Sequence, residues 1–164
     1  NFHNRGRRIE EQIEVLRRLW TEPVVTYDGR WHHIEAAGIQ PLPVQRPIPV
    51  WMGAATEPAI KRAARIADGW FPQFGADERG AQMVDMFRRF LHEAGRDAAA
   101  VPIEARIQFG DANPERWKRE LEVWRERKAS YVSVVTMKAG LRTPNDHIDA
   151  IERFMETARE FRST

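Results

Sequence analysis

The sequence predicts an α/β fold built on a parallel β-sheet, and this prediction comes from the order of its elements. Short apolar runs with the composition of strands alternate with segments of helical periodicity from residue 48 onward. A helix that joins two strands lets them lie parallel, and four such strands need helical cover on both faces of the sheet. The expected order is therefore a helix, a hairpin and then four strand-and-helix units.

The first of these units lies in the stretch IPVWMGAATEPAIKRAARIADGWF, which begins at Ile48. Ile48–Met52 is a short run of β-formers, and three residues with almost no side chain follow it. Thr56 can act as the N-cap of a helix whose first turn contains a proline. Asp68 and Gly69 end that helix before the next apolar run. This unit predicts a ligand site at the carboxyl end of its first strand, because ligands gather there in parallel sheets.

The remaining elements follow from caps and periodicity. Asn4, Asp77, Asn113 and Thr143 are candidate N-caps, and Gly95 is a natural residue to end a helix. Asp28-Gly29 between two β-rich arms indicates a hairpin, and residues 40–49 form an extended, proline-rich segment. The predicted helices are residues 5–20, 56–67, 77–94, 114–128 and 144–162, and the predicted strands are 48–52, 70–74, 101–109 and 131–137. The stripes expected to be buried include Ile9, Ile13, Leu16 and Trp20 in the first helix and Ile148, Ile151, Phe154, Met155 and Ala158 in the last.

Composition indicates a globular chain with one core. The 164 residues are 42% hydrophobic and 30% charged, with a formal net charge of +2 and no cysteine. Acidic and basic residues are interleaved, which argues against a nucleic-acid surface. Because no apolar run approaches the length of a membrane span, no membrane partner is expected. We expect a soluble, cytoplasmic protein with a single domain over residues 1–164.

Two architectures fit four strand-and-helix units: an open doubly wound sheet or half of a (β/α)₈ barrel. A complete barrel takes about 250 residues, more than this chain has. The first predicted helix has no strand before it, which is the pattern expected of a sequence that begins partway through a barrel. We therefore expect the C-terminal part of a (β/α)₈ barrel.

Three sequence segments resemble the later part of luciferase-like flavin-dependent oxidoreductases, especially actinobacterial members that use deazaflavin. They are EQIEVLRRLWTEP, PLPVQRPIPVW and RAARIADGWFP. The resemblance covers nearly the whole chain. It implies a (β/α)₈ TIM barrel in which residues 21–47 are an insertion.

The resemblance also implies a redox cofactor, FMN or coenzyme F420, and a small-molecule substrate. The family binds the phosphate-bearing end of the cofactor at a small-residue loop that matches Gly53, Ala54, Ala55 and Thr56. The first strands of the family barrel, which carry much of the isoalloxazine pocket, have no counterpart here. The implied function is a part of an oxidoreductase or monooxygenase in which this segment anchors the cofactor phosphate.

The residues themselves leave other interpretations open. Gly53–Thr56 can be a tight turn and a helix cap without any ligand. His32 and His33 are neighbours on a strand arm and point to opposite faces, so they cannot chelate one metal, and no metal site is expected. His92 and His147 are expected at the surface. No residue stands out as a catalytic acid or base.

A non-catalytic half-barrel that binds at most a phosphate ligand is the alternative function. Half of a barrel leaves unpaired strand edges and an uncovered apolar face. We therefore expect a homo-oligomer, through edges such as those at Ile48 and Tyr131, or association with the missing N-terminal half.

Overall fold

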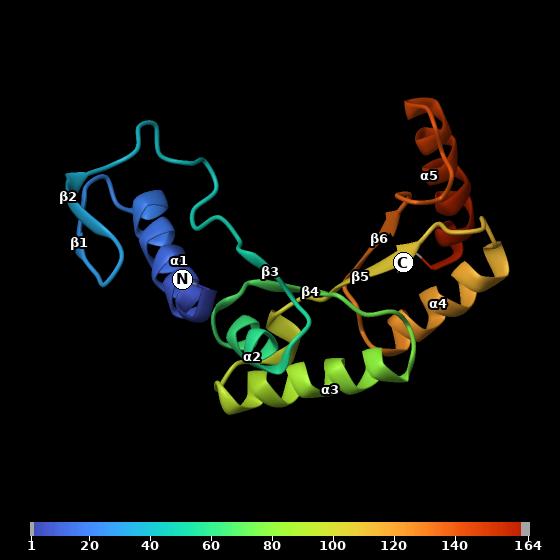
Figure 1. Ribbon diagram of the computed structural model, residues 1–164, viewed down its shortest axis with the longest axis horizontal. Coiled ribbons are helices and arrows are strands. Elements are labelled where there is room, and N and C mark those ends of the chain that lie inside the picture. Colours follow the sequence, from blue (N-terminus) through green and yellow to red (C-terminus); the bar gives the residue numbers. More distant parts are fainter. Residues whose placement is uncertain (1, 162–164) are drawn as a thin grey trace. The chain divides into compact units, whose positions relative to one another are not determined.

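The computed structural model describes residues 2–161, which divide into two compact units (Figure 1). The first unit is Asn1–Val50 and the second is Trp51–Thr164. The boundary lies three residues after the end of the predicted insertion at residue 47. The assignment of residues 1–164 to one domain stays a prediction. Each unit is described by itself.

The first unit is a helix with a β-hairpin. It contains the short 3₁₀ helix η1 (Phe2–Asn4), α1 (Arg5–Thr21), β1 (Val25–Asp28) and β2 (His33–Ala37), and the two strands are antiparallel. The predicted hairpin turn after Asp28 is confirmed. Ile13 and Val15 of α1 are buried, but Ile9 and Leu16 are 38% and 40% exposed, so half of the predicted stripe is wrong. Within this unit, the hairpin covers only part of the apolar stripe of α1.

Glu11 of α1 binds the loop of the hairpin. Its carboxylate accepts hydrogen bonds from the backbone N–H groups of Arg30, Trp31 and His32, at 3.1, 2.8 and 2.8 Å. The Nδ1 atom of His32 lies 2.9 Å from the same carboxylate. Burial alone would raise the pKa of Glu11, but the hydrogen bonds favour the charged form and the net result is a pKa below its ordinary value of 4.5.

The first prediction concerns the acid stability of this unit. Because the pKa of Glu11 is lower in the folded state, its contribution to stability is complete above about pH 4.5 and is lost as the pH falls through the lowered value. Glu11→Gln is therefore expected to melt at a lower temperature than the native protein at pH 7, with a gap that closes below pH 4.5. Thermal melts from pH 7 to pH 3 measure this. Glu35→Gln, at an exposed position on β2, is the control, and an equal effect of both substitutions contradicts the prediction.

The second unit contains four parallel strands in sequential order. They are β3 (Trp51–Ala54), β4 (Gly69–Pro72), β5 (Glu104–Gln108) and β6 (Tyr131–Val135). β3 pairs with β4 and β5 with β6, both parallel, and a parallel bridge between Trp70 and Ile103 joins β4 to β5. A doubly wound sheet reverses its strand order, whereas the strands of a barrel follow one another. The order observed here is that of a (β/α)₈ barrel.

Each strand is followed by a helix, and most of the predicted caps are confirmed. The Asp77 carboxylate accepts from the N–H of Gly80 at 2.8 Å, Asn113 caps its helix through two N–H groups, and Thr143 forms a capping box. Gly95 has the left-handed φ of +68° that ends a helix. The helices are α2 (Glu57–Ile66), α3 (Glu78–Glu93), α4 (Pro114–Glu126) and α5 (Pro144–Ala158), with 3₁₀ turns η2 (Ala98–Ala100) and η3 (Arg159–Phe161). Within the described residues 2–161, no helix has the length and apolarity to cross a membrane.

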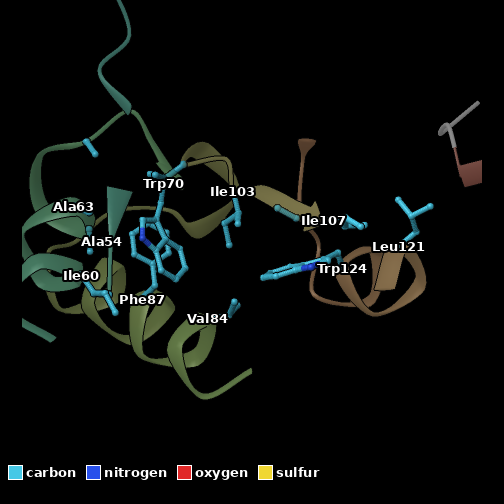
Figure 2. Close-up of a cluster of buried hydrophobic side chains, with 14 of the residues drawn as sticks. Ala54, Ile60, Ala63, Trp70, Val84, Phe87, Ile103, Ile107, Leu121 and Trp124 are labelled. Atoms are coloured by element: carbon cyan, nitrogen blue, oxygen red, sulfur yellow. The ribbon is translucent and has the colours of Figure 1, made fainter. Parts of the chain in front are cut away.

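The core lies between these helices and one face of the sheet (Figure 2). Trp70 of β4 is fully buried and stacks on Phe87 of α3, with ring centroids 4.4 Å apart. Trp117 of α4 is also fully buried, between the rings of Phe109 and Phe154 at 5.0 and 5.4 Å. Both tryptophans are therefore packing residues of the core.

The last helix is less buried than its apolar stripe predicts. Phe154 is 2% exposed, but Ile148 and Ile151 are 53% and 43% exposed. The expectation that both isoleucines face inward is wrong for this unit. Helical periodicity identifies an apolar stripe but not how much of that stripe the neighbouring elements cover.

The other face of the sheet carries a different set of side chains. Along β5, Ala105 and Ile107 are fully buried against the helices, whereas Arg106 between them points to the opposite face. Trp51 lies on that face, with its ring 5.2 Å from Phe71 and 5.7 Å from Tyr131. We call this surface the inner face, because it corresponds to the interior of a barrel.

A pair of glycines on the inner face gives the second prediction. A Cβ atom on Gly69 would lie 2.3 Å from the Trp51 ring, whereas one on Gly53 would meet Gln73 at an ordinary 3.4 Å. Gly69→Ala is therefore expected to lower the free energy of unfolding by about 1–3 kcal/mol through overpacking, and Gly53→Ala to change it by much less. Urea denaturation measures both. Equal losses would contradict this account of the inner face.

Candidate functional site

The candidate site is the carboxyl edge of the sheet in the second unit. Parallel strands present their carboxyl ends at one edge, and in barrels this edge carries the chemistry. β3 ends at Ala54, so the predicted loop Gly53–Thr56 lies at this edge. A cavity of about 610 Å³ lies at the opposite, amino edge of the sheet, beside Val101 and Ile103. We do not consider it a candidate site, because ligands of parallel α/β folds bind at the carboxyl edge.

The four predicted residues do not share one environment. Gly53 is exposed on the inner face, and Ala54 is 3% exposed and packs in the core. Ala55 and Thr56 are exposed between the strand and α2. The methyl group of Ala54 is directed away from the inner face, so it does not obstruct an approach to this backbone. Only the main chain of Ala54 can serve a ligand.

Thr56 occupies the predicted N-cap of α2, but its side chain makes no capping hydrogen bond. Its carbonyl accepts from the N–H groups of Ala59 and Ile60, both at 2.9 Å. No hydrogen bond from the N–H groups of Ala55, Thr56 or Glu57 occurs within residues 2–161. Backbone donors at a helix N-terminus favour an anion, although the carboxylate of Glu57 in the first turn opposes one. This arrangement can hold a phosphate that reaches the backbone from the side of Gly53.

A second feature of this edge is a cavity of about 350 Å³ between the ends of β4, β5 and β6. Its charged residues are two cations, Arg106 of β5 and Lys138 after β6. Gln73 and Gln108 supply amide groups to the same cavity. Among its lining residues there is no carboxylate. The cavity therefore has a positive lining with donors for hydrogen bonds.

Gln73 connects the predicted loop to this cavity. Its Nε2 atom lies 3.4 Å from the position of a Cβ on Gly53, and its Oε1 atom is 3.5 Å from Nη1 of Arg106. Nε2 also donates to the carbonyl of Phe71 at 3.3 Å, which orients the amide. The small-residue loop and the cationic cavity are thus two parts of one edge.

The sequence contained a signal for this cavity. Glu104, Arg106 and Gln108 alternate with Ala105 and Ile107 in a strand that was predicted to be covered on both faces. Polar residues at every second position of such a strand indicate that one face lines an interior space. From sequence, residues 101–109 are predicted as a strand alone, and the cavity is an addition from the structure.

The histidines take structural positions. His32 is half-buried against Glu11, His33 pairs with Asp28, and His92 is exposed as predicted. His147 is half-buried and 2.8 Å from the hydroxyl of Thr136, so its predicted surface position is wrong. Within the described part of the chain, no cluster of three or more metal-ligating side chains occurs.

The fold and the position of this edge define a class, the (β/α)₈ barrel proteins that bind their ligands at the carboxyl ends of the strands. The model of one family within this class, luciferase-like monooxygenase, matches residues 1–161. The chain belongs to the luciferase-like monooxygenase family, and the resemblance inferred from sequence is confirmed.

Curated relatives and solved structures agree with this assignment. An F420-dependent glucose-6-phosphate dehydrogenase of Gordonia bronchialis is 30% identical over 127 residues, which are 75% of this chain and 37% of that protein. The coenzyme F420-dependent tetrahydromethanopterin reductase from Methanopyrus kandleri has a TM-score of 0.54 at 17% identity, over 91% of this chain and 54% of its own. EDTA monooxygenase from Chelativorans has a TM-score of 0.53 at 16% sequence identity, and the match covers 98% of this chain and 46% of that protein.

These structural likenesses show the fold, and the predicted fold class is confirmed. The chain spans 37% of the length of the Gordonia bronchialis relative. The activity of the whole protein is therefore a proposal.

Proposed function

We propose that this chain is part of an oxidoreductase or monooxygenase that uses coenzyme F420 or FMN, and that its Gly53–Thr56 loop anchors the cofactor phosphate. The observation that carries this proposal is the set of unpaired backbone donors at the start of α2, beside Gly53, which has no side chain and is bordered on the inner face by the amide of Gln73. The family of the chain supports the choice of a redox cofactor. The F420-dependent relative supports F420.

The residues present fit the phosphate end of either cofactor. The N–H groups of Ala55, Thr56 and Glu57 and the hydroxyl of Thr56 supply donors. Gly53 adds no side chain on the inner face, so the ligand can reach the strand itself. The carboxylate of Glu57 lies near the same donors, and we expect it to turn toward solvent when a phosphate is bound.

Once bound, the cofactor supplies the redox chemistry, and the protein supplies orientation and a shielded pocket. The inner face of this chain contributes to that pocket through the rings of Trp51 and Phe71. The helices on the outer face keep water away from the strands.

The experiment that tests this proposal compares FMN with riboflavin, which has the same ring system but no phosphate. Absorbance and fluorescence titrations of the purified protein with FMN, riboflavin and F420 give the three affinities. We expect FMN to bind at least about tenfold more tightly than riboflavin, because charge-assisted hydrogen bonds hold the phosphate. Equal affinities for FMN and riboflavin would refute the anchoring role.

A second candidate function is a non-catalytic half-barrel that self-associates, and a specific observation favours it. Large apolar side chains at the β6 edge are exposed, with Tyr131 at 57% and Val132 at 39%. We further propose that the edges at β3 and β6 are covered by strands from the rest of the polypeptide or from a second copy. The edge predicted at Ile48 lies at Trp51 instead, where β3 begins.

Native mass spectrometry separates these functions on the same sample. A complex that retains F420 or FMN supports the oxidoreductase. A homodimer that takes up neither cofactor supports the half-barrel scaffold. A monomer, with or without bound cofactor, would contradict the proposed coverage of the strand edges by a second copy.

A further inference from the structure

We infer that the cavity lined by Arg106 and Lys138 is a subsite for an oxyanion, a carboxylate or phosphate group carried by the substrate. This inference rests on the proposed function, since it assumes that the carboxyl edge serves a redox enzyme. It adds the class of substrate, which neither the family nor the loop Gly53–Thr56 specifies.

The charged side chains of the cavity all have one sign. Its two ionised side chains are both cationic, and its polar neutral side chains are the amides of Gln73 and Gln108. Lys138 follows β6 with a left-handed φ of 62°, in a loop at the mouth of the cavity. A concave surface lined by one sign of charge concentrates ligands of the opposite sign.

Arg106 has unused hydrogen-bond donors in this cavity. Arg106 as a residue is half-buried, its guanidinium is accessible where it contacts Gln73, and within residues 2–161 it pairs with no carboxylate. Its hydrogen bond to Oε1 of Gln73 is long, at 3.5 Å, and leaves most of its five donors unused. A partly buried cation of this kind is stabilised by an anion, and a planar guanidinium suits the two oxygens of a carboxylate or phosphate.

The cationic cavity is separate from the cofactor loop. The bridge at Trp70 aligns Gln73 with Arg106 across β4 and β5, and β3 lies on the far side of β4. The loop after β3 is therefore two strand spacings from Arg106, roughly 10 Å. This distance allows a cofactor phosphate and a substrate anion to be bound together. The two groups would then lie at one edge with the amide of Gln73 between them.

The test is a titration of ¹⁵N-labelled protein with inorganic phosphate and, separately, with acetate, followed by NMR. The subsite predicts saturable shifts of the side-chain amides of Gln73 and Gln108. In Arg106→Gln this binding is expected to weaken about tenfold or more. Arg106→Lys keeps the charge and is expected to retain part of the affinity, which separates loss of charge from loss of folding.

Matched controls lie on the same unit. Lys138→Gln removes the second cation of the cavity, and its control is Lys128→Gln. Lys128 also has a left-handed φ, 54°, but it lines the cavity at the opposite edge. Arg89 is an exposed arginine on α3, and Arg89→Gln is the control for Arg106→Gln. We expect both control variants to bind phosphate like the native protein. Weakening of equal size in the controls would overturn the inference, because it would reflect the overall charge alone.

The titration distinguishes this inference from the proposed function. Phosphate that shifts the N–H signals of Ala55 and Thr56 but not those of Gln73 and Gln108 overturns the subsite and leaves the cofactor anchor in place. A second outcome is saturable phosphate binding at Gln73 and Gln108 with equal affinities for FMN and riboflavin. This outcome supports the oxyanion subsite and refutes the role of Gly53–Thr56 as a phosphate anchor. Unchanged affinity in Arg106→Gln overturns the subsite, whichever residues shift.

Discussion

Replacing Trp117 with alanine is expected to lower the free energy of unfolding of the second unit by about 3–5 kcal/mol. Its side chain is fully buried, packs between the rings of Phe109 and Phe154, and donates from Nε1 to the carbonyl of Phe109 at 3.2 Å. The substitution leaves a large cavity between α4, α5 and the end of β5. The Phe109 carbonyl loses the indole donor but still accepts from Arg116 Nη2 and from the N–H of Ala112, so most of the loss comes from the cavity. Because domains are stable by only about 5–15 kcal/mol, a loss of this size brings the unit close to unfolding.

Denaturation by urea, followed by circular dichroism, measures this loss. Trp117→Phe keeps an aromatic ring in the same place and removes only the hydrogen bond and part of the volume. We expect it to lose clearly less than the alanine variant. A loss below about 1 kcal/mol for Trp117→Ala would show that the site collapses around the cavity, contrary to the packing described here.

The second large effect is on cofactor affinity. Ala55→Asp places a carboxylate beside the backbone donors proposed to hold the cofactor phosphate, at a position that is exposed and tolerates a side chain. Like charges in contact cost several kcal/mol, so the affinity for FMN is expected to fall about a hundredfold or more. The same titrations that compare FMN with riboflavin measure this effect.

Ala55→Asn is the matched control, because asparagine has nearly the same shape without the charge. We expect it to weaken FMN binding far less than aspartate does. Riboflavin affinity is expected to be nearly equal in the two variants, since riboflavin has no phosphate to repel. If aspartate and asparagine weaken FMN binding equally, the effect is steric and the phosphate lies elsewhere.

Helix caps and strand order could be predicted from the sequence because both depend on local chemistry. Asp77, Asn113 and Thr143 precede helices and accept hydrogen bonds from the first turn, as their side chains favour. The four strands were placed within a few residues of their observed ends. Asn4 and Thr56 depart from this pattern. Each occupies its predicted cap position, but neither side chain makes a cap hydrogen bond.

The inner face could not be predicted to the same degree, because it depends on which residues of different strands meet. The contact between Gln73 and Arg106 joins positions 33 residues apart in sequence. The exposure of Ile148 likewise depends on how much of α5 its neighbours cover. The sequence predicts the small-residue loop of the site. The cationic cavity could not be predicted, because its lining comes from three different strands, β4, β5 and β6.

The central claim is that Gly53–Thr56 anchors the phosphate of a redox cofactor. A crystal structure of the complete protein with bound F420 or FMN tests it most directly. The account predicts a phosphate oxygen within about 2.7–3.2 Å of the N–H group of Ala55 or Thr56, over the unsubstituted face of Gly53. A cofactor whose phosphate lies away from the start of α2, with these donors bound to water or to protein, would contradict it.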